Sequence, residues 1–152
     1  MSKKVIDALN NARSLELTAI SQYMSQHYEL DNQGFGKLAS KIKDIAIVEM
    51  RHAEALAERI LFLDGDPIYK PAELVKKGEE IAALLQTDID LEAGGIRAYN
   101  DAAAVCAAEK DHVSVQLFES LLDKEEDHID YFQKTLEHVQ KLGAPYLATL
   151  MD

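Results

Sequence analysis

The chain has 152 residues, 47% of them hydrophobic, which is enough for one domain with a sizeable core. Its formal net charge of −11 argues against binding nucleic acid through phosphate contacts, and is compatible with attracting cations or with simple solubility. No signal peptide or membrane-length apolar stretch is visible, and Cys106 stands alone. We therefore expect a single domain over residues 1–152 in a reducing cytoplasm, with no membrane partner.

The chain is expected to form four long helices and a short fifth. Turn residues at 31–36 separate the first two helices, and Gly143 ends the fourth. Two prolines and two glycines interrupt residues 65–78, which we interpret as a long connection. Short turns within each pair, with one crossover between the pairs, predict an all-α, ferritin-like four-helix bundle. The expected helices cover approximately residues 4–30, 36–63, 79–108, 112–141 and 145–151.

Each long helix carries a glutamate in the middle of its apolar stripe. Successive helical residues turn by about 100°, so residues three or four apart share a face. Four buried carboxylates without cations would be very costly, and no Lys or Arg lies on these stripes. A pair of divalent metal ions would neutralise them. The four residues are Glu16, Glu49, Glu92 and Glu125, and a spacing of 33 residues separates both the first two and the last two.

Two Glu-x-x-His motifs add imidazoles to this set, Glu49 with His52 and Glu125 with His128. Residues three apart on a helix lie on one surface, close enough for one metal ion. Two such motifs, each with a lone glutamate from another helix, form the ligand set of carboxylate-bridged di-iron bundles. Six mixed oxygen and imidazole ligands suit iron or manganese better than structural zinc. The alternative is carboxylates that only snorkel or pair.

Two other side chains near these motifs have open interpretations. Tyr23 lies on the core face of the first helix and either donates a hydrogen bond or an electron near the metals, or simply packs. Met50 lies about 100° around the helix from Glu49, so it points away from the metals. It belongs to a second apolar stripe on the outside of the bundle, which the residues alone favour as an ordinary dimer contact with Met as gap filler. The stripe also contains Leu17, Ile20, Met24, Ala46, Ile47, Ala53 and Ala57.

At these residues the chain resembles the bacterioferritins over almost its whole length. The most similar stretches are LELTAISQY at 15–23, EMRHAE at 49–54, ERILFLDG at 58–65 and DHID at 127–130. The resemblance implies that Glu49 and Glu125 bridge two iron ions. It implies terminal ligands at each ion, namely Glu16 with His52 and Glu92 with His128.

The resemblance also implies a function, which is oxidation of Fe(II) by dioxygen or hydrogen peroxide and storage of the ferric mineral in a hollow shell. It implies a haem shared between two subunits through Met50, and it leaves open an electron-donor protein as a further partner. The family typically builds 24-subunit shells with a fifth helix at the four-fold contacts. Because the fifth helix is short here, a 12-subunit shell stays open, as does the haem type.

Two other functions compete with iron storage. A non-storage di-iron oxidase or peroxidase of the rubrerythrin-like type would use the same ligands, but the chain lacks the paired Cys-x-x-Cys motifs of a rubredoxin-type centre. A metal-free helical interaction protein is the second alternative, and the four core carboxylates argue against it.

Overall fold

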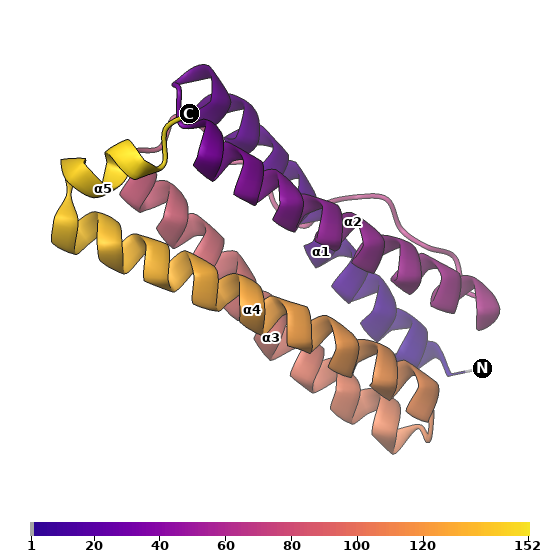
Figure 1. Ribbon diagram of the computed structural model, residues 1–152. Coiled ribbons are helices and arrows are strands. Elements are labelled where there is room, and N and C mark those ends of the chain that lie inside the picture. The colour runs from indigo at the N-terminus through magenta and orange to yellow at the C-terminus, as the bar shows by residue number, and fades with distance from the viewer. Residues whose placement is uncertain (1) are drawn as a thin grey trace.

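The computed structural model describes residues 2–152, which form five helices and no strand (Figure 1). The predicted fold class is confirmed, and every helix boundary lies within two residues of the expected one. Four long helices form the bundle, and the fifth lies across one end of it (Figure 1). The helices are α1 (Lys3–Asn32), α2 (Gly36–Phe62), α3 (Ile81–Ala108), α4 (His112–Leu142) and α5 (Ala144–Thr149).

Local side chains explain where the long helices begin and end. Ser2 caps α1 by accepting a hydrogen bond from the Val5 amide at 3.4 Å, and Asp111 caps α4 by accepting from the Ser114 amide at 3.0 Å. Helix α4 ends at Gly143, whose φ of +62° is left-handed and favours glycine.

The helices pack in two antiparallel pairs, α1 with α2 and α3 with α4. The crossover of residues 63–80 runs along α1 in an extended path, so the predicted single long connection is confirmed (Figure 1). Polar side chains of α1 hold its backbone, as when Gln22 donates to the Lys76 carbonyl at 2.9 Å and accepts from the Lys76 amide at 2.8 Å. Asn10, Arg13, Ser14, Thr18 and Glu29 also hydrogen-bond to it.

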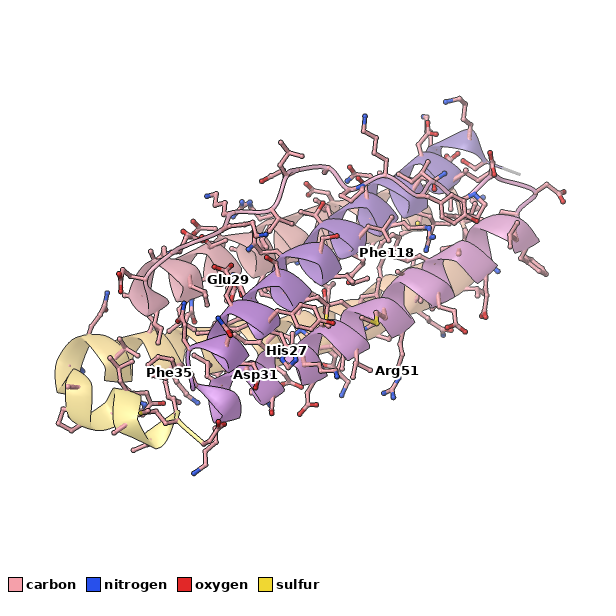
Figure 2. All side chains as sticks on the ribbon, turned by 90° about the horizontal axis from the view of Figure 1, so that it is seen from above. His27, Glu29, Asp31, Phe35, Arg51 and Phe118 are labelled. Carbon is pink, nitrogen blue, oxygen red and sulfur yellow. The ribbon has the colours of Figure 1, made fainter. Side chains whose placement is uncertain are left out.

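The hydrophobic core is divided into two clusters along the bundle axis. One cluster, around Leu38 and Phe132, lies near the α1–α2 turn, and the other, around Leu9 and Phe118, lies near the opposite end. Figure 2 shows Phe118 among the helices and Phe35 near the short fifth helix. On every long helix the metal-ligand candidates fall between the two clusters. The two core clusters therefore fix the position of a buried polar layer between them.

The last residues of the chain complete the N-terminus of α2. Phe35 at the start of α2 offers no side-chain cap, and the Leu150 carbonyl instead accepts from the Lys37 and Leu38 amides at 3.2 and 3.4 Å. Leu150 is buried against the core cluster at this end. The short C-terminal helix thus docks within its own chain.

Candidate metal centre

All six predicted ligand residues meet in the middle of the bundle and are buried. Each long helix contributes at least one of them, because each helix carries its glutamate between the two core clusters. The exposed fractions are 0% for Glu16, 1% for Glu49, 9% for His52, 1% for Glu92, 3% for Glu125 and 7% for His128.

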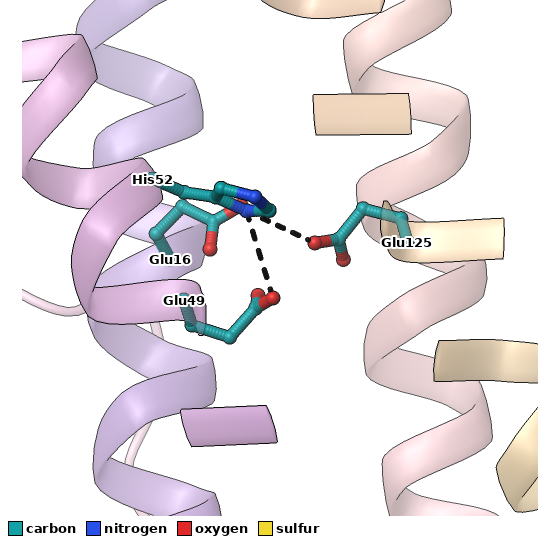
Figure 3. Close-up of side chains that lie close together, drawn as sticks. All are labelled: Glu16, Glu49, His52 and Glu125. Carbon is teal, nitrogen blue, oxygen red and sulfur yellow. Dashed lines mark ion pairs between the residues drawn. The ribbon is translucent and has the colours of Figure 1, made fainter. Parts of the chain in front are cut away.

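The six residues form two overlapping groups, and within each group the ligand atoms lie within 4.8 Å of one another. One group adds Glu16 and His52 to the pair Glu49 and Glu125 (Figure 3). The other group adds Glu92 and His128 to the same pair, and neither contains a residue from outside the six. Shared carboxylates between two ligand groups are the arrangement that bridges a pair of metal ions.

Both histidines point a ring nitrogen at the carboxylates. His52 Nδ1 lies 3.4 Å from Glu125 Oε1 and 3.6 Å from Glu49 Oε1 (Figure 3). His128 Nδ1 lies 3.1 Å from Glu49 Oε1 and 3.6 Å from Glu92 Oε1. The same nitrogen therefore faces the centre from two different helices.

Each of the six residues carries one buried ligand atom without a hydrogen-bond partner. Leaving such atoms unpaired is costly, whereas two divalent cations would engage all of them at once. The donor set of four carboxylates and two imidazoles fits iron. The unpartnered atoms are Glu16 Oε2, Glu49 Oε1, His52 Nδ1, Glu92 Oε2, Glu125 Oε1 and His128 Nδ1.

The crowded carboxylates favour protonation when no metal is bound. Burial raises the pKa of Glu49 well above its ordinary value, and the charges of Glu16 and Glu125 raise it further. Burial likewise raises the pKa of Glu125, helped by its neighbour Glu92. A cation between the two groups would therefore stabilise the charged form of both Glu49 and Glu125.

Two tyrosines hydrogen-bond to the carboxylates that belong to one group only. Tyr23 donates to Glu92 Oε1 at 2.6 Å, so it does more than pack. Tyr99 donates to Glu16 Oε1 at 2.5 Å, a role that the sequence analysis missed. A signal was present, because Tyr23 follows Glu16 and Tyr99 follows Glu92 with the same spacing of seven residues on the two helices.

Met50 lies on the outside of the bundle, with 39% of its surface exposed. It borders a shallow groove of about 490 Å³ whose walls are mainly apolar. Arg51, the next residue, points outward from α2 (Figure 2). Ala46 was also expected on this stripe, but it is fully buried in the core. The groove is lined by Arg13, Leu17, Ile20, Met50, Ala53, Glu54 and Ala57.

A ferritin-like domain family matches residues 6–142. The chain is 43% identical over 147 residues to the bacterioferritin of Desulfovibrio desulfuricans, which covers 97% of this chain and 82% of that protein. It is 38% identical over 150 residues to the bacterioferritin of Streptomyces coelicolor, covering 98% of this chain and 90% of that protein. The chain belongs to the bacterioferritins.

An X-ray structure of the Desulfovibrio desulfuricans bacterioferritin matches this fold with a TM-score of 0.96 at 42% identity, over 97% of this chain and 86% of that one. That structure is described as the diiron site in different catalytic states. Among residues 2–152 of the present bacterioferritin, no helix is long and apolar enough to cross a membrane.

Proposed function

We propose that this bacterioferritin binds two Fe(II) ions per chain between the six buried residues and oxidises them, as a ferroxidase. The observation that carries the proposal is the pair of overlapping ligand groups, which share Glu49 and Glu125 and leave one unpartnered atom on every member. Glu49 and Glu125 bridge the two ions. Glu16 with His52, and Glu92 with His128, complete the two positions.

The adjacent positions let two electrons leave together. Two Fe(II) ions lose one electron each, and dioxygen takes both electrons with two protons to give hydrogen peroxide. With hydrogen peroxide as the oxidant, two electrons and two protons give two water molecules. The four carboxylates favour this direction, because their negative charge stabilises Fe(III) more than Fe(II).

Binding of Fe(II) also releases protons. In the metal-free centre, burial and neighbouring carboxylates raise the pKa of Glu49 and Glu125, so these carboxyls keep their protons to a higher pH than ordinary glutamates do. Only the deprotonated carboxylates bind the ion.

Iron storage is the proposed outcome of this oxidation. The ferric product moves into a hollow shell, of 24 or 12 subunits built from dimers, in the cytoplasm. A non-storage oxidase or peroxidase of the rubrerythrin-like type is the second candidate, because the same six residues would serve it. Iron retained after aerobic loading separates the two, since storage gives many ions per chain and the alternative gives two.

Haem is the second group that we propose for this chain, at the groove beside Met50. The side chains fit it, because a partly exposed thioether lies on an apolar wall and can act as an axial ligand. One chain supplies one methionine, so a second copy would complete the site at one haem per two chains. Bound haem would supply electron transfer toward the stored iron. A Soret band at that stoichiometry, with the native mass of the assembly, tests this part.

Stopped-flow oxidation tests the ferroxidase proposal. Purified metal-free protein is mixed with increasing Fe(II) in air, and the amplitude of the rapid phase is expected to saturate at two Fe(II) per chain. Oxidation no faster than that of Fe(II) in buffer would reject the ferroxidase, and saturation at one ion would reject the paired site.

A further inference from the structure

Two phenol–carboxylate pairs cross between α1 and α3 at the metal centre. Tyr23 of α1 reaches Glu92 of α3, and Tyr99 of α3 reaches Glu16 of α1. The two pairs are equivalent because α1 and α3 run antiparallel and each carries a glutamate followed seven residues later by a tyrosine. Each of the two metal positions therefore has its own tyrosine.

The Tyr99 hydroxyl has one strong acceptor. Tyr99 is 1% exposed, so water does not compete for the hydroxyl. Glu16 Oε1 lies 2.5 Å from the phenol oxygen, whereas the Ala12 carbonyl, the second acceptor in reach, lies 3.5 Å away. A hydroxyl donates one proton, and the short, charge-assisted bond to the carboxylate is much the stronger.

The Tyr99 hydrogen bond gives the two Glu16 oxygens different surroundings. Oε1 accepts from the phenol and also lies 3.7 Å from His52 Nδ1, while Oε2 is buried and has no hydrogen-bond partner. A carboxylate on a flexible side chain can rotate, and a fixed donor on one oxygen removes that freedom. We propose that Tyr99 is a positioning residue, which fixes the Glu16 carboxylate through Oε1 and leaves Oε2 free for the metal position formed with His52.

The packing around Tyr99 supports a fixed phenol. Its ring lies beside Phe118, with centroids 5.9 Å apart. Gly95, one turn earlier on α3, lies beside the ring and beside Glu125, and a Cβ added there would make ordinary van der Waals contact with both at 3.5 Å. Phenylalanine at position 99 would keep this ring packing and remove the donor alone.

The inference rests on the proposed metal centre, so the experiment tests the two separately. Co(II) is titrated anaerobically into metal-free protein and followed by its visible absorption. His128→Ala removes a ligand of the metal position that contains Glu92, so the titration then measures mainly the position of Glu16 and His52. His52→Ala does the reverse. Tyr99→Phe and its matched control Tyr23→Phe are each measured in both backgrounds.

Tyr99→Phe is expected to weaken Co(II) binding about 10- to 100-fold in the His128→Ala background and less than about twofold in the His52→Ala background. Tyr23→Phe is expected to show the opposite pattern. Tyr99→Leu also lacks the hydroxyl, so it must weaken Co(II) binding at the same position as Tyr99→Phe does. It replaces Tyr99→Phe in the test if that variant does not fold.

Unchanged Co(II) affinity in the His128→Ala background would overturn the role of Tyr99, and so would equal weakening in both backgrounds, which indicates general packing. Failure of the unsubstituted protein to bind two Co(II) per chain would instead reject the underlying metal centre.

Discussion

Glu49 and Met50 are neighbours in the chain, yet they belong to two very different regions. Glu49 is 1% exposed and faces five other ligand candidates from the four long helices. Met50 is 39% exposed and borders an apolar groove on the outside of the same helix. The turn of about 100° between consecutive helical residues separates the two regions.

The two regions differ in whether a single chain supplies every residue of the site. One chain supplies all six residues of the buried centre, whose ligand atoms already lie within reach of each other. The Met50 groove is open to solvent and offers one thioether, which would be half of the proposed symmetric haem site. The buried centre should therefore work in each chain by itself, whereas the Met50 groove should depend on dimer formation. Changes to one region should leave the other unaffected.

The largest expected effect is at the shared carboxylates. Glu125→Ala, or Glu49→Ala, removes a proposed ligand of both metal positions. Rapid Fe(II) oxidation should therefore fall by at least about 100-fold, which exceeds the loss typical when a residue that only hydrogen-bonds to a ligand is removed. Stopped-flow absorbance measures this, and circular dichroism should show a folded helical protein. Haem content should not change.

Glu126→Ala is the matched control, because Glu126 is exposed and should leave the rate nearly unchanged. An unaltered rapid phase in Glu125→Ala would show that this glutamate is no ligand.

Met50→Leu should produce the reverse pattern. Leucine keeps the size and apolar character of the side chain, so the dimer should survive while most of the haem is lost with its axial ligand. Initial Fe(II) oxidation should stay within about twofold, since Met50 points away from the centre. Release of stored iron, which needs electrons, should slow.

Met151→Leu makes the same substitution at another exposed methionine, 45% exposed at the end of the chain, and should retain haem. Full haem with an unaltered spectrum in Met50→Leu would assign the groove to dimer packing.

A smaller effect should appear in the pH dependence of stability. In the metal-free protein the pKa values of Glu49 and Glu125 are raised in the folded state, so the folded state binds more protons than the unfolded state. The free energy of unfolding should therefore fall as pH rises from the ordinary glutamate pKa through the raised values. With Fe(II) or Co(II) bound the trend should reverse, because metal binding needs deprotonated ligands.

Thermal unfolding of both forms between about pH 5 and 8 measures the two slopes. Metal-free protein that becomes more stable with rising pH would show that these carboxyls are not crowded.

The smallest functional effect is expected outside both regions. Gln22→Ala removes two hydrogen bonds to the Lys76 backbone and should lower stability by about 1–2 kcal/mol, with the melting temperature as the readout. Because the Lys76 amide and carbonyl lie in the crossover, both the oxidation rate and the haem content should stay the same. A large loss of either would tie the crossover to that function.

Local sequence patterns were enough to predict the helices and the six buried residues. Each glutamate sits in a helical apolar stripe, and the Glu-x-x-His spacing fixes the histidines relative to two of them. Packing between the helices then decides which residues at the edge of a stripe are buried in the core. Ala46 was expected on the outer stripe, yet it packs in the core cluster near the α1–α2 turn and is fully buried.

Contacts between distant residues were harder to predict. The Tyr99–Glu16 bond joins residues 83 positions apart, so it depends on the register of α1 against α3. The Leu150 carbonyl caps α2 only because the chain folds back after Gly143. A local sequence pattern shows neither the register of α1 against α3 nor the direction of the chain after Gly143.

Anomalous X-ray scattering from crystals soaked with Fe(II) without oxygen tests the central claim most directly. The account predicts two iron peaks per chain, about 3.5–4 Å apart, with Glu49 and Glu125 between them, Glu16 and His52 at one, and Glu92 and His128 at the other. A single peak, or iron bound elsewhere with Glu49 and Glu125 free of it, would contradict the account.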